Sequence, residues 1–417
     1  MTELHDTLAQ ECVSRHADAL LAFARALIAA PSPSPPGDER AVAAVAQAEL
    51  QRLELGAVEV AAPRPERPNL LCRWESGRPG RTLILNGHLD TKAPGPLDLW
   101  SADPYEPVVR EGQLYGLGAA DMKGPCAALA YGVLAAKLAG AQTVSGTVLL
   151  ALTADEEGEA QDGARYLVQD LGVRGDAALI AEPCGVTRDW EWLPLVSRGF
   201  GGARFVVHGT SVHSSVADLF PSGNASVAAA ELLLHLQRRL RLRCPDGLPH
   251  RSAPTFVVGS TFTSGQGLAM VPGRAEFTVN VRTVPGMTRE GVATDVETCL
   301  ADFRRERPDA DVEWDFVPGT LAWTTPTETS PQEPLVSAVV EAARIALGRT
   351  PPFGTFPGGT DAIWWQGLAG IPTIPAFGPG MLTQCHRPNE SIAIAELTRA
   401  AAVYALTILR YLGSDDP

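Results

Sequence analysis

The chain has 417 residues, 45% apolar and 20% charged, which is the composition of an ordinary globular protein. This length exceeds one ordinary core, so we expect two domains or one elaborated domain. The net charge of -14 argues against nucleic acid as a partner, and no apolar stretch is long enough to suggest a membrane span. Seven cysteines without a C-x-x-C pair and an acidic start, "MTELHDTLAQ", predict reduced thiols and a cytoplasmic protein without a secretory signal.

The first half of the chain alternates helices with apolar strands. Helical periodicity over residues 5–30 ends at the prolines of "PSPSPPGD", and a second helix follows in "ERAVAAVAQAELQRL". Next come the strands "NLLCRW" and "TLILNGH", the helix "MKGPCAALAYGVLAAKLAG", and the strands "TVLLALTAD" and "AALIAEP". This order predicts an α/β domain with a mixed, largely parallel sheet covered on both faces.

The pattern changes at residue 195. Strand, helix, two strands, helix and strand follow one another up to residue 314, from "GGARFVVHG" to "DVEWDFV". This is the ferredoxin-like βαββαβ order. We therefore expect a small domain over 195–314, inserted into a larger domain formed by 1–194 and 315–417, and ligands often bind in clefts between domains.

Acidic and imidazole side chains follow the ends of several apolar strands. They are His88 with Asp90, Asp121, Glu156 with Glu157, Glu182, and His386. Each has a plain alternative when taken alone: a core histidine, a helix cap at Asp121, or a solvated face at the glutamate pair. In open α/β sheets, however, the carboxyl ends of the strands converge on one crevice. Acids gathered there would repel one another unless cations held them.

The type of side chain indicates which cations these are. Histidine and carboxylate ligands without cysteine suit zinc or a similar divalent ion at a hydrolytic site. Because one carboxylate can bridge, the ligand set favours two ions. Cobalt and manganese stay open, since ligand type constrains these ions only loosely.

Five motifs together resemble those of the M20 metallopeptidase family. They are "GHLDT", "YGLGAADMKG", "TADEEGE", "AEP" and "CHRPNE", in the family's order and approximate spacing. The resemblance covers nearly the whole chain and is strongest to the branch of acetylornithine deacetylase and succinyl-diaminopimelate desuccinylase. It implies a zinc-binding catalytic domain interrupted by a ferredoxin-like lid, which agrees with the order of elements above.

The resemblance also implies a ligand set. His88 and Glu182 would bind one ion, and Glu157 and His386 the other. Asp121 would bridge both ions.

The same resemblance assigns roles around the ions. Asp90 would be the carboxylate that orients the imidazole of His88. Glu156 would be the general base, taking a proton from water and passing it to the departing amine. The peptide bond between Asp121 and Met122 would be cis, as in family members.

Further residues would contact the substrate. In "GTSVHSS", His213 would stabilise the developing oxyanion; in dimeric members this histidine crosses to the partner's active site, which implies a homodimer. Arg282 would bind a substrate carboxylate, together with Gly359 and Thr360 of the "GGT" segment. The plain alternatives are an exposed histidine, an exposed strand arginine and an ordinary glycine turn.

Two positions depart from the family pattern. "GLAMVPG" places Met270 where the lid commonly has asparagine, and "EPCG" places Cys184 where many relatives have threonine. Met270 removes a polar group near the substrate or the oxyanion, so substrate choice is expected to differ from that of the standard deacetylases.

The leading hypothesis is a hydrolase with two metal ions that cleaves the amide bond of an N-acyl amino acid. An exopeptidase of the same family, cutting dipeptides or a C-terminal residue, would use the same chemistry. A catalytically silent relative that only binds amides is a third possibility, but such proteins should have lost a ligand or the base. All five apparent ligands and Glu156 are present.

Overall fold

The computed structural model describes residues 3–140, 142–219, 223–246, 253–319 and 323–413. The chain forms two compact units, the first made of Met1–Ser197 with Thr327–Pro417 and the second of Arg198–Pro326. Within the described residues, every helix is too short or too polar to cross a membrane.

A mixed sheet lies at the centre of the first unit, with strands in the order β1-β2-β6-β3-β7-β16. Four of them, from β6 to β16, are mutually parallel, and β2 runs antiparallel to both β6 and β1. The strands are β1 (Ala57–Ala61), β2 (Asn69–Glu75), β3 (Thr82–His88), β6 (Thr147–Thr153), β7 (Ala177–Ile180) and β16 (Thr373–Ile374). The expected α/β domain with a mixed, largely parallel sheet is confirmed.

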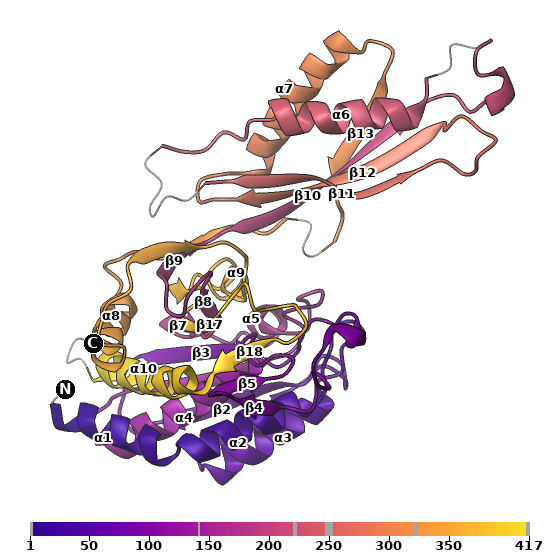
Figure 1. Cartoon of the computed structure of the whole chain (residues 1–417). Coiled ribbons are helices and arrows are strands. Elements are labelled where there is room, and N and C mark those ends of the chain that lie inside the picture. The colour runs from indigo at the N-terminus through magenta and orange to yellow at the C-terminus, as the bar shows by residue number, and fades with distance from the viewer. Residues whose placement is uncertain (1–2, 141, 220–222, 247–252, 320–322, 414–417) are drawn as a thin grey trace. The chain divides into compact units, whose positions relative to one another are not determined.

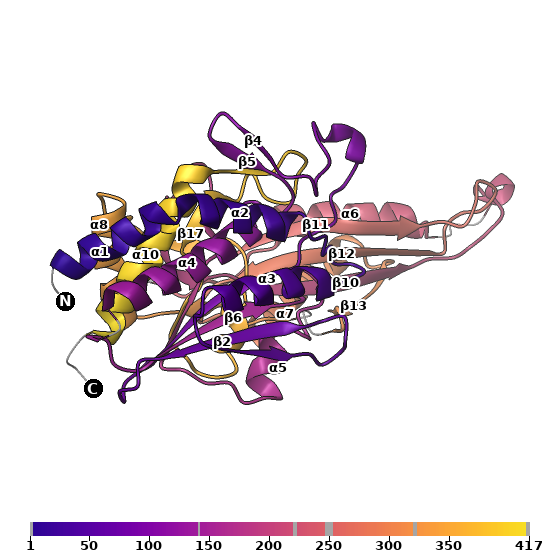
Figure 2. The same cartoon turned by 90° about the horizontal axis from the view of Figure 1, so that it is seen from below.

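Helices cover both faces of this sheet. They are α1 (Glu3–Arg15), α2 (Ala17–Ile28), α3 (Arg40–Arg52), α4 (Lys123–Gly140), α5 (Ala164–Gln169), α8 (Pro334–Ala346), α9 (Ala362–Trp365) and α10 (Ile394–Leu412). Figure 1 shows α4 and α10 on one side of β3 and α9 on the other. In the view of Figure 2 the helices α1 to α4 and α10 lie together in front of the sheet.

Strand β3 shows how the sequence sets this packing. Side chains alternate along a strand, so Leu83, Leu85 and Gly87 share one face. A Cβ at Gly87 would come within 2.7 Å of the Cys126 sulfur on α4, so only glycine fits there. On the opposite face Asn86 accepts a hydrogen bond from the Trp365 indole of α9, at 3.1 Å.

Short strands surround the main sheet. The pairs or triples are β17 (Gly378–Met381) with β8 (Pro183–Gly185); β14 (Thr327–Glu328), β9 (Leu193–Ser197) and β15 (Phe353–Phe356); and β18 (Ser391–Ala393), β5 (Gln113–Tyr115) and β4 (Val108–Arg110). A short 3-10 turn, η1 (Leu97–Leu99), precedes β4.

The second unit follows the chain order β10, α6, β11, β12, α7, β13, and its sheet has the order β11-β12-β10-β13. The elements are β10 (Gly199–His208), η2 (Ser214–Val216), α6 (Ala225–Arg239), β11 (Thr255–Ser264), β12 (Arg274–Thr283), α7 (Arg289–Glu306) and β13 (Asp311–Phe316). This is a ferredoxin-like arrangement with its own apolar core. The compact unit extends past residue 314, where the sequence pattern placed the end of the insert, to Pro326.

The helical run expected over residues 5–30 is divided in two at His16. The backbone there has φ -103° and ψ 9°, outside helical values, and the imidazole Nδ1 donates to the Cys12 carbonyl at 2.8 Å. Apolar periodicity does not report such a break, because both halves present apolar residues to the same core.

Candidate metal centre

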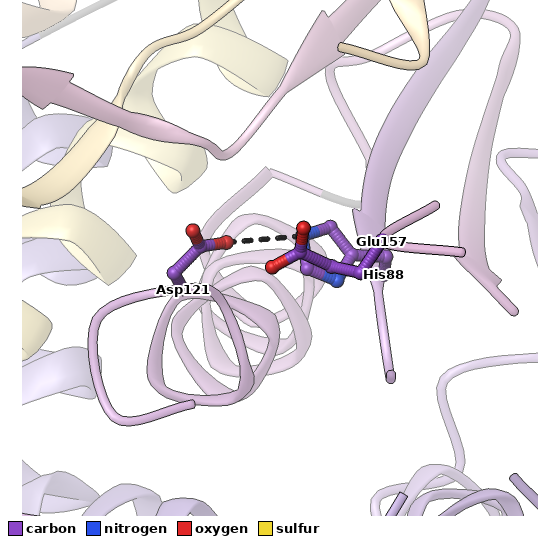
Figure 3. Close-up of side chains that lie close together, drawn as sticks. All are labelled: His88, Asp121 and Glu157. Atoms are coloured by element: carbon purple, nitrogen blue, oxygen red, sulfur yellow. Dashed lines mark hydrogen bonds and ion pairs between the residues drawn. The ribbon is translucent and has the colours of Figure 1, made fainter. Parts of the chain in front are cut away.

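His88 ends β3 and is almost completely buried. Its Nε2 lies 3.1 Å from Asp121 Oδ1 and 3.2 Å from Glu182 Oε1. Figure 3 shows the Asp121 carboxylate reaching from the start of α4 toward the imidazole, with Glu157 beside it. Residues from four separate segments therefore meet at the carboxyl end of β3.

Asp121 lies between two imidazoles. Its second oxygen, Oδ2, is 3.1 Å from Nε2 of His386, and this nitrogen is 2.6 Å from Glu157 Oε1. The peptide bond from Asp121 to Met122 is cis, which confirms the expectation from the motif. One carboxylate thus presents one oxygen to each histidine, the arrangement that a ligand bridging two ions requires.

The side chains fit divalent ions by both distance and chemistry. Two groups have ligand atoms that all lie within 4.8 Å of one another: His88 with Asp121 and Glu157, and His88 with Glu156 and Glu182. All donors are imidazole nitrogens or carboxylate oxygens, as suits zinc, cobalt or manganese. Among the described residues neither group contains a cysteine, and the Cys184 thiol is buried in β8.

The pKa shifts of the acids in the centre also favour a bound cation. Burial, reinforced by the charge of Asp121, raises the pKa of Glu182 to about 7, and burial also raises the pKa of Glu156 well above its usual range. Burial opposes ionisation of Asp121 as well, but hydrogen bonds with His386 and His88 bring its pKa below the usual value. These acids ionise readily only beside a positive group, and a bound cation meets that requirement.

Asp90 contacts His88 chiefly through its backbone. Nδ1 of His88 is 3.0 Å from the Asp90 carbonyl oxygen and 3.5 Å from Asp90 Oδ1. The carboxylate instead accepts the backbone amides of Glu156 at 3.2 Å and Glu157 at 3.0 Å. One residue therefore orients the imidazole and also holds the start of the loop that carries the two glutamates.

Asp155 holds the rest of that loop, a role that its place in the sequence did not predict. It has φ 59°, an uncommon conformation outside glycine. Its carboxylate accepts the backbone amides of Glu159, Gln161 and Asp162 at 2.9–3.1 Å. The loop after β6 thus folds around this side chain, and its position beside Glu156 was the only sequence signal.

Arg67 forms a buried ion pair with Asp155. Its guanidinium is buried, with Nη1 donating to Glu39 at 2.5 Å and Nη2 lying 3.3 Å from Asp155 Oδ1. Nη2 also donates to the hydroxyl of Ser34 at 3.3 Å. A buried cation between two carboxylates compensates their charge where water is excluded.

Replacing Arg67→Ala is expected to destabilise the fold by about 3–5 kcal/mol, because it leaves buried carboxylates uncompensated. Urea unfolding measures the change. Arg40→Ala is the matched control, since that arginine forms an exposed pair with Asp38, and its unfolding midpoint should match wild type. Equal midpoints for Arg67→Ala and wild type would contradict this role.

Lys92 adds a positive charge at the edge of the centre. Its Nζ is 3.2 Å from Glu157 Oε2 and also donates to the Glu157 carbonyl. The side chain is half-exposed. A lysine directly after "HLDT" matches no expected ligand, so nothing in the sequence singles it out.

His213 belongs to the second unit and is exposed. Its Nδ1 accepts the backbone amide of Ser215 at 3.2 Å, so the neutral ring carries its proton on Nε2, which can donate. The residue opposite it in an antiparallel bridge is Met270, the position that departs from the family pattern. An apolar side chain therefore stands beside this histidine.

The three remaining predicted residues lie in different units. Arg282 is on β12 of the second unit, where its guanidinium lies over the Phe200 ring, 5.0 Å from the centroid. Gly359 and Thr360 precede α9 in the first unit. The Thr360 hydroxyl donates to the Pro375 carbonyl at 2.9 Å, so its single proton is engaged within the fold.

A mixed α/β unit with histidines and carboxylates gathered at its strand ends is the architecture of a metal-dependent hydrolase. Residues 84–410 match the model of peptidase family M20/M25/M40. The chain belongs to this family.

Relatives extend the match over most of the chain. A succinyl-diaminopimelate desuccinylase of Xanthomonas euvesicatoria pv. vesicatoria is 32% identical over 391 residues, covering 90% of this chain and 95% of the relative. The solved structure of the dipeptidase Dug1p from Saccharomyces cerevisiae superposes with a TM-score of 0.75 at 17% identity, over 99% of this chain and 100% of that one. A dinuclear metal-binding M20 peptidase of Bacillus subtilis gives a TM-score of 0.66 at 17% identity, over 96% and 99% of the two chains.

The protein is therefore a metal-dependent hydrolase that acts on amide bonds. The solved structures are distant in sequence and show the shared fold. The sequence identity to the desuccinylase relative is high enough, over most of both chains, to support membership of the family.

Metal binding is expected to release protons. Hydrogen bonds with Asp121 and Glu157 raise the pKa of His386 to about 11 in the metal-free protein. At about pH 8 this imidazole is therefore protonated, whereas a metal ligand must be neutral. Affinity should rise with pH up to that pKa, and calorimetry in two buffers of different ionisation heat should show proton release; heats independent of the buffer would contradict it.

Proposed function

We propose that the protein hydrolyses the amide bond of an N-acyl amino acid at a site for two divalent ions, most simply zinc. The ligands are His88, Asp121, Glu157, Glu182 and His386. The observation that carries the proposal is Asp121, whose two oxygens each lie 3.1 Å from a different imidazole. The desuccinylase relative supports an acyl amino acid as substrate, and the N-succinyl group is the first acyl group to test.

The bound ions would polarise the amide carbonyl and make the attacking water more acidic. Glu156 supplies the base: its Oε2 is 4.0 Å from His88 Nε2, and its carboxylate lies within 4.8 Å of ligand atoms of His88 and Glu182. Burial raises the pKa of Glu156 well above its usual range, so the carboxylate takes up a proton from water readily. Glu156 then donates that proton to the departing amine.

Two residues of the second unit have roles in the proposed reaction. His213, with its proton on Nε2, donates to the oxyanion, and Arg282 binds the substrate carboxylate through its guanidinium. In the first unit, Gly359 and Thr360 offer backbone amides to a substrate carboxylate, while the Thr360 hydroxyl already donates to the Pro375 carbonyl.

We also propose a homodimer formed through the second unit. In the sheet that the described residues form, β11 is an edge strand, and it exposes Val257 and Phe262. Helix α6 exposes Val227 and Leu234. Sedimentation velocity should give the mass of two chains, and Val257→Asp should yield monomers; a monomeric wild type would reject the dimer.

The test is a hydrolysis screen on the zinc-reconstituted protein, with released amine read by mass spectrometry. The panel holds N-acetyl, N-succinyl and N-formyl amino acids beside simple dipeptides, and Glu156→Gln serves as the blank. Amine released from acyl amino acids supports the proposal and names the acyl group. Release from dipeptides alone would assign an exopeptidase instead, and silence across the panel would favour a binding protein.

A further inference from the structure

Glu390 closes the "CHRPNE" segment that carries His386, and no role in the chemistry falls to it. Its side chain is 1% exposed. The carboxylate oxygen Oε1 accepts the backbone amide of Ala120 at 2.8 Å and that of Asp121 at 3.0 Å. A buried carboxylate from one segment thus holds the backbone of the aspartate that lies between the two histidines.

The segment is tied to the Asp121 loop at a second point. The Glu390 carbonyl accepts the amide of Gly116, at the start of that loop, at 3.0 Å. The neighbouring Asn389 is anchored on both sides of its amide: Oδ1 accepts the Ser101 amide at 2.8 Å, and Nδ2 donates to the Leu99 carbonyl at 3.0 Å. These bonds leave the segment little freedom to shift along the loop.

These hydrogen bonds matter because two residues of the segment have left-handed backbone conformations. His386 has φ 57° and Asn389 has φ 60°, conformations that non-glycine residues adopt at a cost. The surrounding bonds must hold them. Hydrogen bonds in buried surroundings are electrostatically stronger than those in water, so the two amides bound to Glu390 are held firmly.

We infer that Glu390 is a positioning residue that sets Asp121 and His386 as a pair. Its side chain binds backbone amides of the Asp121 loop. Because Glu390 belongs to the same segment as His386, these bonds also fix that segment against the loop. The inference rests on the proposed metal site and predicts that the ion shared by Asp121 and His386 depends on Glu390.

The experiment compares Glu390→Ala with Glu390→Gln in the full chain. The Gln carbonyl can still accept both amides, whereas Ala leaves them without an acceptor. Glu396→Ala is the matched control: this buried glutamate on α10 accepts from the Trp190 indole at 2.8 Å and pairs with Arg399, outside the ligand group. Titration of each metal-free protein with Co²⁺ gives affinity and the visible absorption of the bound ion.

We expect Glu390→Ala to bind one of its two Co²⁺ ions roughly 10–100-fold less tightly than wild type, with an altered absorption band. Glu390→Gln should restore both, and Glu396→Ala should match wild type. Wild-type binding and spectrum in Glu390→Ala would overturn the inference, as would an equal loss in Glu396→Ala. If Glu390→Ala does not fold, Glu390→Asp, which withdraws the carboxylate by one methylene, replaces it with the same expected loss. A wild type that binds no Co²⁺ would instead refute the proposed function.

Discussion

Glu156→Gln is expected to lower kcat by roughly 10²–10⁴-fold while leaving KM and metal content near wild type. The substitution keeps the size of the side chain but removes the group that takes and returns the proton. Glu156 is not one of the five proposed ligands, so the ions should stay. Steady-state kinetics on the best substrate of the panel, with metal analysis of the same sample, measures both quantities.

Glu159→Gln is the matched control, because this exposed glutamate lies on the same loop and accepts a side-chain hydrogen bond from Gln161, outside the ligand group. Its kinetics should equal those of wild type. Full activity in Glu156→Gln would sink the assignment of the base. Loss of metal together with activity would place Glu156 among the ligands instead.

Asp121→Ala is expected to lose both ions and, with them, all measurable hydrolysis. One Asp121 oxygen lies 3.1 Å from His88 and the other 3.1 Å from His386, and among the described residues Asp121 is the one carboxylate that pairs with both histidines. Without it, two imidazoles and several buried acids remain with a broken ligand set. Metal analysis after dialysis measures the loss.

Asp295→Ala provides the comparison, since Asp295 is a buried aspartate of the second unit that pairs with Arg243 at 2.5 Å. That variant should keep the metal content of wild type. Two ions retained by Asp121→Ala would refute the bridging role, and a single retained ion would restrict Asp121 to one of them.

Much of the fold follows from pattern. Strand β3 and helix α4 are long, apolar and bounded by turn residues, so their type is readable from the sequence, and the βαββαβ order of the second unit was equally clear. Several strands that were not predicted, such as β8 and β14, have three residues or fewer, but β1 and β9, with five residues each, were missed as well. Their pairing is decided by neighbours distant in the sequence, which local periodicity does not contain.

The residues of the site also differ in how far the sequence predicts them. Side chains that can bind an ion are few in kind, and here they stand at strand ends, so the clustering of His88 and Glu157 could be predicted from the sequence. Positioning residues such as Asp155 and Glu390 bind backbone amides. Every residue except proline has such an amide, so the sequence does not reveal which ones are bound. The hydroxyl of Thr360 illustrates the converse, because only the structure shows that its proton is already donated.

The most direct test of the central claim is to titrate metal-free protein with zinc and follow bound metal and amide hydrolysis together. We predict no activity without metal, activity that rises with occupancy, and saturation at two ions per chain. Full activity in metal-free protein, or a chain that binds no zinc at the concentrations that support hydrolysis, would contradict the account.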